Sequence, residues 1–108
     1  VTFLLTGDIE SAGEDALGDV PAQVLKVPHH GSRSSSTPRF IAAVSPRVAL
    51  VSVGHANRFG HPHPAVMERY ARAGVWVLRT DRDGAVTVST DGERLFIRTF
   101  RSGVEIAR

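Results

Sequence analysis

Side chains that can bind metal ions or transfer protons follow three separate apolar runs of this chain. Asp8 comes after the run 1–5, the adjacent pair His29 and His30 comes after the run 24–27, and His55, His61 and His63 come after the run 48–53. The chain has no cysteine, so any metal must be held by carboxylate and imidazole. Those ligands suit zinc, manganese or another divalent ion used in catalysis.

Each of these residues also has a simpler interpretation. Asp8 alone could stabilise the N-terminus of a following helix through the helix dipole. A lone loop histidine usually bonds to backbone, but two in succession before Gly31-Ser32 favour a functional site. His61 and His63 alternate with prolines and could form only a stiff loop with a helix cap. His55 has no motif support and is interpreted as a surface-loop residue.

The apolar runs have the length of β-strands, and shorter amphipathic segments with helix signals separate them. Strands are predicted over 1–5, 24–27, 48–53 and 75–78, and helices over 9–17, 38–44 and 65–73, with a hairpin of 85–89 and 94–100 at the end. Strands that alternate with helices predict an α/β sheet. Polar loops after the strands' carboxyl ends then meet at one edge of that sheet, where ligands usually bind.

Capping and turn signals support these boundaries. Ser11 and Glu14 have the spacing of a capping box, and Thr37-Pro38 is typical of an N-cap followed by the first helical residue. Asp91-Gly92 is a hairpin turn signal. The serine-rich stretch 32–36 is predicted to be a flexible loop, because it is polar throughout.

Length and composition limit the possible classes of protein further. A chain of 108 residues is at most one small domain, and no apolar run approaches the roughly 20 residues that span a bilayer. The net charge of +2 and the spread arginines are only a weak indication of a polyanionic partner. The chain opens inside a predicted strand without an initiator Met, which suggests a piece of something longer.

The combination of motifs resembles a known family. Leu5-Thr6-Gly7-Asp8, Val27-Pro28-His29-His30-Gly31-Ser32, Gly60-His61-Pro62-His63-Pro64 and Arg79-Thr80-Asp81-Arg82-Asp83-Gly84 are similar to the metallo-β-lactamase-fold domain at the C-terminal end of ComEC-type competence proteins. The resemblance covers roughly residues 1–89. It implies half of an αββα sandwich, with a mixed sheet, helices on one face and a C-terminal β-hairpin. It also implies two divalent ions, zinc or manganese, used on the phosphodiesters of DNA during uptake.

The resemblance also implies roles for single residues. Asp8 matches the family's metal-bridging aspartate, and His30 is expected to be a metal ligand. His29 is expected to face the phosphate or transfer a proton, and His61 and His63 to contact the substrate or its transition state. Ser32 is expected to donate a hydrogen bond to a phosphate oxygen.

One family motif, HxHxDH, is absent from these residues. The chain is therefore expected to be the C-terminal half of the catalytic domain, with the motif in an upstream half. Alone it should bind metal weakly, be inactive, and dimerise or aggregate through an exposed edge of the strand 1–5. The parent is expected to be a bacterial membrane channel protein, with this domain in an aqueous compartment beside the membrane.

Two other functions stay open at this point. One is a metallo-hydrolase on the same fold that acts on another phosphoester or on an acyl substrate. The other is a non-catalytic module that binds nucleic acid or has a structural role, which would show salt-dependent DNA binding without cleavage.

Overall fold

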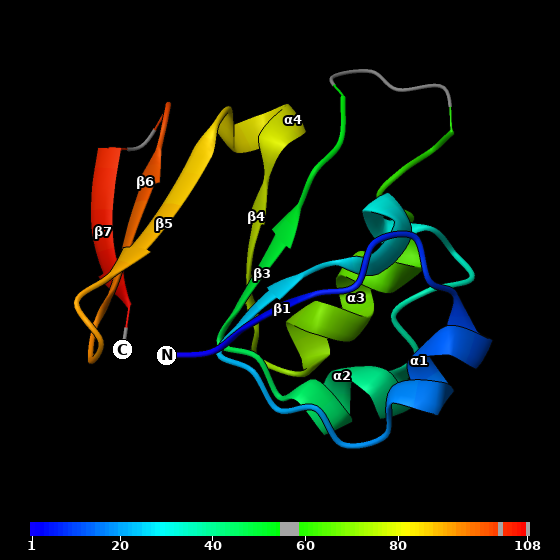
Figure 1. Cartoon of the computed structure of the whole chain (residues 1–108). Helices are drawn as coiled ribbons and strands as arrows, with labels where there is room; N and C mark the ends of the chain where they lie inside the picture. Colours follow the sequence, from blue (N-terminus) through cyan, green and yellow to red (C-terminus); the bar gives the residue numbers. More distant parts are fainter. Residues whose placement is uncertain (55–58, 102, 108) are drawn as a thin grey trace.

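A computed structural model of the chain describes residues 1–54, 59–101 and 103–107, with side chains through 101 (Figure 1). His55 lies outside the described residues, so its interpretation as a surface-loop residue stays a prediction. Among the residues that the structure describes, no helix has the length and apolar character to cross a membrane.

Four parallel strands form the sheet that carries the rest of the fold. They are β1 (Phe3–Leu5), β2 (Val24–Lys26), β3 (Val48–Val51) and β4 (Trp76–Arg79), and they lie side by side in chain order. The register pairs Leu4 with Leu25, Leu25 with Ala49, and Ala49 with Val77. Strands β2 and β3 are apolar on both faces because both faces are covered, as is usual for parallel strands.

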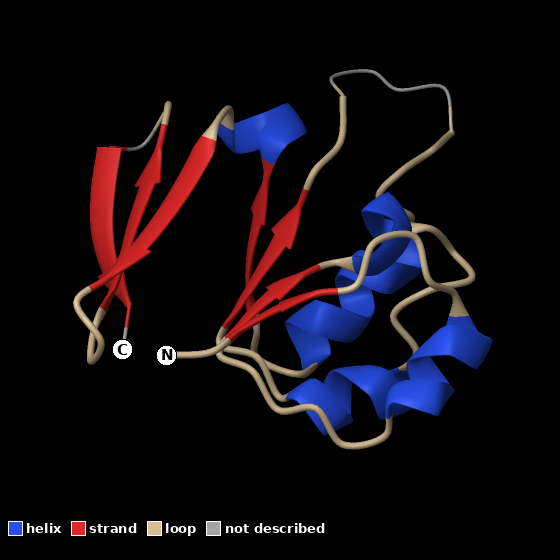
Figure 2. Cartoon of the chain, viewed as in Figure 1, coloured by secondary structure: helices blue, strands red, loops and turns tan. Residues whose placement is uncertain are grey.

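The three helices between the strands lie on one face of this sheet (Figure 2). They are α1 (Ser11–Leu17), α2 (Pro38–Val44) and α3 (Pro64–Arg72). The buried core between helices and sheet contains Leu25, Val27, Phe40, Ile41, Val44, Ala49, Val51, Val66 and Tyr70. The predicted cap of α2 is confirmed, since Thr37 Oγ1 accepts from the Phe40 N–H at 3.2 Å and Pro38 follows it.

A second, antiparallel sheet lies on the other side of β3 and β4 (Figure 1). It consists of β5 (Val86–Thr90), β6 (Leu95–Thr99) and β7 (Gly103–Ala107), and the short helix α4 (Thr80–Asp83) leads into it. A separate apolar cluster of Val48, Leu78 and Ile97 joins the two sheets. The predicted α/β class with a C-terminal antiparallel unit is confirmed. The antiparallel strands pair with one another in a sheet of their own, and β7 extends the predicted hairpin.

The first strand is only partly covered. Among the described strands, β1 pairs only with β2, and the side chains of Phe3 and Leu5 are 46% and 75% exposed. Leu4, which points to the other face, packs against the main core. β1 therefore presents both an unpaired backbone edge and an apolar face, which is a surface that proteins usually cover.

The predicted capping box at Ser11 is wrong. Ser11 is the first residue inside α1, and its N-cap, Glu10, makes no side-chain cap. Glu14 is 2% exposed and instead accepts hydrogen bonds from the backbone N–H groups of Ser36 and Thr37. These N–H groups precede α2, so a contact between distant segments replaces the local one.

The prediction of a flexible serine loop is also wrong. Ser35 and Ser36 are fully buried. Ser35 Oγ donates to Pro28 O at 3.0 Å and Ser36 Oγ bonds to Tyr70 Oη at 2.8 Å. Arg69 donates to the carbonyls of both serines, at 3.3 Å and 3.2 Å. The polar residues form a buried network because their partners come from α1, α3 and the turn after β2.

Candidate active site

The loops that follow β1, β2 and β3 meet at the carboxyl edge of the parallel sheet. Two backbone hydrogen bonds join them. The His29 N–H donates to Gly7 O at 2.9 Å, and the His63 N–H donates to Gly31 O at 2.9 Å. The segments that the sequence predicted to converge therefore do so, with the histidine pair between the other two.

The turn that carries the pair has an unusual backbone. In Pro28–Gly31, His29 has φ 49° and ψ 43°, and His30 has φ 54° and ψ 24°. Both are left-handed, which costs a non-glycine residue about 1–2 kcal/mol. The Ser32 N–H closes the turn on His29 O at 2.9 Å. Strain of this kind is held by the surrounding structure and gathers at functional sites.

Gly31 completes the turn and brings the third loop close. Its φ is 79°, and a Cβ at this position would lie 2.6 Å from Pro62 Cβ. No side chain fits in that space. The contact between Gly31 and Pro62 fixes the loop of His61 and His63 beside the histidine pair.

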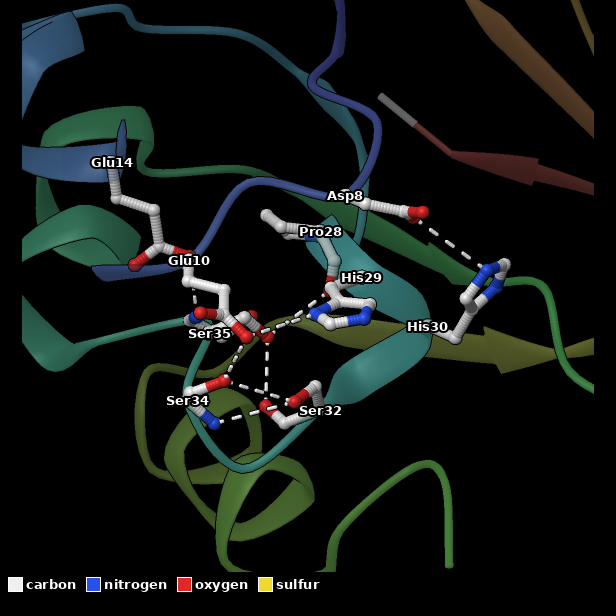
Figure 3. Close-up of polar contacts among 10 residues, drawn as sticks. Asp8, Glu10, Glu14, Pro28, His29, His30, Ser32, Ser34 and Ser35 are labelled. Atoms are coloured by element: carbon white, nitrogen blue, oxygen red, sulfur yellow. Dashed lines mark hydrogen bonds and ion pairs between the residues drawn. The ribbon is translucent and has the colours of Figure 1, made fainter. Parts of the chain in front are cut away.

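His30 turns toward Asp8 (Figure 3). Its Nε2 lies 3.7 Å from Asp8 Oδ1, and its Nδ1 lies 2.7 Å from Ser52 O. Because a carbonyl oxygen can only accept, Nδ1 carries the proton and Nε2 offers a lone pair when the ring is neutral. Metal-binding histidines typically have this arrangement, with the second nitrogen bound to a backbone carbonyl.

Asp8 and His30 fit a divalent ion as two members of a larger ligand set. Both side chains are open to solvent, at 72% and 46% exposed, and an oxygen and a nitrogen donor face each other. Within the described part of the chain, no three potential ligands are placed so that together they could hold one metal ion. The pair can hold an ion tightly only with further ligands.

His29 turns the other way, toward Glu10 (Figure 3). Its Nδ1 lies 3.4 Å from Glu10 Oε1, without the geometry of a hydrogen bond. The same carboxylate oxygen accepts from Ser34 Oγ at 2.7 Å. Glu10 was not among the residues predicted to form the site. Its only local indication is its place two residues after Asp8, directly before α1.

His61 completes a cluster of three imidazoles. Its ring centroid lies 5.9 Å from that of His29 and 6.4 Å from that of His30, and its plane is within 16° of the His30 plane. Desolvation, and then the neighbouring His29, His30 and His63, lower the pKa of His61 below its usual value. The neutral ring is therefore favoured, as a proton acceptor at neutral pH requires.

His63 and Ser32 have structural partners of their own. His63 Nδ1 accepts from the Ala65 N–H at 3.1 Å and so caps α3. Ser32 is 9% exposed, and its Oγ lies 3.1 Å from Ser34 Oγ (Figure 3). Their expected roles in catalysis and phosphate binding stay predictions, because these contacts neither require nor exclude them.

A hollow opens beside the histidine cluster. It has a volume of about 290 Å³ and is lined by His30, Ser52, Val53, Gly54, Phe59 and His61. The ring of Phe59 lies 5.9 Å from His61 and is 80% exposed. The sequence analysis missed this residue, although a single aromatic in a polar loop was a usable indication.

The motif at the end of β4 supports the hollow without entering it. Thr80 Oγ1 donates to Val53 O and accepts from the Val53 N–H, both at 2.8 Å. Arg79 binds Asp81 through two hydrogen bonds, of 3.0 Å and 2.8 Å. These bonds raise the pKa of Arg79 and lower that of Asp81. This guanidinium is engaged with a carboxylate rather than facing the histidines.

The chain matches one family model and several known proteins in sequence. The family model described as the metallo-beta-lactamase superfamily matches residues 1–55, which include β1, the histidine turn and β3. No solved structure matches significantly.

Three curated relatives are similar over most of the chain. Identity is 40% over 90 residues with ComE operon protein 3 of Bacillus subtilis, which is 80% of this chain and 12% of that protein. Competence protein ComA of Neisseria gonorrhoeae is 44% identical over 78% of this chain and 13% of its own length. Recombination protein 2 of Haemophilus influenzae is 39% identical over 94% of this chain and 13% of its own length. The chain thus spans about an eighth of each relative.

Proposed function

The chain belongs to the metallo-beta-lactamase superfamily, a family of metal-dependent hydrolases, and from that premise we propose that it is part of a phosphodiesterase domain acting on DNA. The superfamily alone does not specify the substrate. DNA is proposed because two of the relatives are named as a competence protein and a recombination protein.

The facing donors of Asp8 and His30 are the observation that carries the proposal. They lie 3.7 Å apart at the carboxyl edge of the sheet, and Ser52 O fixes the tautomer of His30. We propose that Asp8 and His30 hold divalent ions, zinc or manganese, together with the HxHxDH motif of another segment of the parent protein. Bound there, the ions would supply positive charge to stabilise a phosphodiester as its bond to oxygen breaks.

The chain's own residues would orient the substrate and move protons. The rings of His30 and His61 lie 6.4 Å and 5.9 Å from that of His29, and imidazoles can give a proton to or take one from an oxygen. Glu10 beside His29 Nδ1 would keep that ring in one orientation. His61 and His63 are proposed to contact the substrate or its transition state, and the His63 ring also caps α3.

The partners follow from the same proposal. The exposed face of β1, with Phe3 and Leu5, would be covered by the half of the domain that carries HxHxDH. Without it, we expect the chain to self-associate through this strand and to be inactive. The resemblance to competence proteins also leads us to propose an association with the membrane channel of a DNA-uptake protein, and one relative is named as a competence protein.

A direct test compares Asp8→Ala with the parent in a protein that carries both this chain and the HxHxDH segment. Single-stranded DNA, double-stranded DNA and a small phosphodiester are supplied side by side with Mn²⁺ or Zn²⁺. We expect metal-dependent cleavage of DNA that Asp8→Ala abolishes. The control is Asp19→Ala, an exposed carboxylate of the loop before β2, which should retain full cleavage.

Three results would contradict the proposal. Cleavage that survives Asp8→Ala would remove Asp8 from the site. Cleavage of acyl substrates or of small phosphoesters alone would assign a different hydrolase activity on the same fold. Salt-dependent DNA binding with no metal and no cleavage would make the domain a non-catalytic binding module.

A further inference from the structure

Phe59 has surroundings that its apolar character does not explain. It is 80% exposed, and a side chain of this size is normally buried or covered. Phe3 and Phe100 are also exposed, at 46% and 85%. Phe3 lies on the edge strand β1, and Phe100 packs over Gly84, where an added Cβ would lie 2.8 Å from Phe100 Cβ. Neither of these two lines the hollow that Phe59 shares with His30.

The walls of that hollow are firmly placed. Thr80 holds both backbone groups of Val53, and Ser52 O accepts from His30. The Gly31–Pro62 contact fixes the loop that carries His61. Phe59 thus stands at the rim of a built hollow rather than on an isolated patch of surface.

The described residues that line the hollow are mostly uncharged. Apart from the two imidazoles, none of the described residues that line the hollow has an ionisable side chain. Apolar groups and the faces of rings predominate, and the volume of 290 Å³ is at the small end of ligand pockets. The described part of this lining can pack against the faces of a flat ring.

The hollow lies beside the facing donors of Asp8 and His30, because His30 belongs to both. The ring of His61 connects Phe59 to His30 in a row of neighbouring rings, since its centroid lies 5.9 Å from that of Phe59 and 6.4 Å from that of His30. At its far end, His30 faces Asp8. A phosphate held at Asp8 and His30 would therefore have the nucleotide that carries it directed along this row.

We propose that the hollow between Phe59 and His30 is a nucleobase subsite, in which the base next to the cleaved phosphate stacks on Phe59. The inference rests on the proposed function. Aromatic stacking tolerates any sequence, because every base has a π-face, and it is the usual device for holding single strands. The subsite would thus favour an unpaired strand, whose bases are free to leave the stack.

The test compares a normal single-stranded oligonucleotide with one that lacks the base beside the cleaved bond, in the protein with both halves of the domain. With the unsubstituted protein, we expect the KM for the abasic strand to be roughly tenfold higher than the KM for the normal strand. In Phe59→Ala the KM of the normal strand should rise by about the same factor, so that the preference disappears. Phe59→Trp should keep it, and Phe100→Ala serves as the exposed-phenylalanine control.

Direct binding separates this inference from the proposed function. With no metal added and no cleavage required, the indole of Phe59→Trp should be quenched by the normal oligonucleotide and much less by the abasic one. If no phosphodiester is cleaved but this difference holds, the proposed function fails and the subsite stands. Equal affinity of the two strands in the parent, or an undiminished preference in Phe59→Ala, would overturn the subsite.

Discussion

Asp8 and Glu14 both follow β1, and their carboxylates have opposite surroundings. Glu14 is 2% exposed and accepts from the backbone N–H groups of Ser36 and Thr37. The side chain of Asp8 is 72% exposed and faces His30 Nε2 at 3.7 Å. A buried carboxylate needs hydrogen bonds from the protein, whereas an exposed one beside an imidazole lone pair is available to an ion. The difference separates Glu14, which holds two segments of the fold together, from Asp8, whose proposed role is to bind metal.

The largest expected effect concerns Glu14. Glu14→Ala leaves two backbone N–H groups without their acceptor in a buried region, which should lower the free energy of unfolding by about 3 kcal/mol. Urea unfolding of the domain that carries this chain measures the change. Glu14→Gln keeps one acceptor oxygen and should cost less. If the unfolding free energy of Glu14→Ala stayed within about 0.5 kcal/mol of the unsubstituted protein, Glu14 would not be needed for stability and would not differ from Asp8 in this respect.

Gly31→Ala tests whether a change in the backbone of the candidate site costs as much stability as a change in the buried network of Glu14. The new Cβ would meet Pro62 at 2.6 Å, and φ is 79°, so we expect a loss of about 2 kcal/mol. The His61 loop should also move away from His30, which the imidazole resonances in NMR spectra would report. Gly74→Ala is the matched control, because its φ is 73° and a Cβ there meets nothing within 4 Å. Equal losses of unfolding free energy in the two variants would show that the positive φ, and not the contact with Pro62, accounts for the cost.

Tyr70 extends the Glu14 network and gives it a pH dependence. Its hydroxyl bonds to Ser36 Oγ at 2.8 Å, so Tyr70→Phe should cost about 1 kcal/mol at neutral pH. Burial raises the pKa of the phenol above its ordinary value. The unfolded chain therefore loses this proton first, and the stability that it contributes should decrease as pH rises above about 10. In Tyr70→Phe, this part of the decrease in stability at alkaline pH should be absent. Measurements of the free energy of unfolding across pH 9–11 would detect the difference.

Much of this arrangement could be predicted from local sequence. The runs around Leu25 and Ala49 are mostly apolar because both faces of these strands are covered, and Thr37-Pro38 begins a helix as its residue types indicate. Asp8 and the histidine pair were placed at one edge by a general property of parallel sheets.

The parts that could not be predicted depend on distant partners. Nothing local shows that Ser36 and Thr37 bind Glu14 in place of a capping box. The opposite directions of His29 and His30 come from two consecutive left-handed residues, which the side chains themselves disfavour. Glu10 and Phe59 were missed because their importance lies in the distances to His29 and His61.

Metal affinity measured together with stability tests the central claim most directly. In the protein with both halves of the domain, Asp8→Asn should weaken Mn²⁺ binding at least about tenfold in a calorimetric titration. Its free energy of unfolding without metal should stay within about 0.5 kcal/mol of the parent. Glu14→Gln should show the reverse, with lower stability and metal affinity retained in the folded protein. Unchanged Mn²⁺ affinity in Asp8→Asn would contradict the assignment of the metal site.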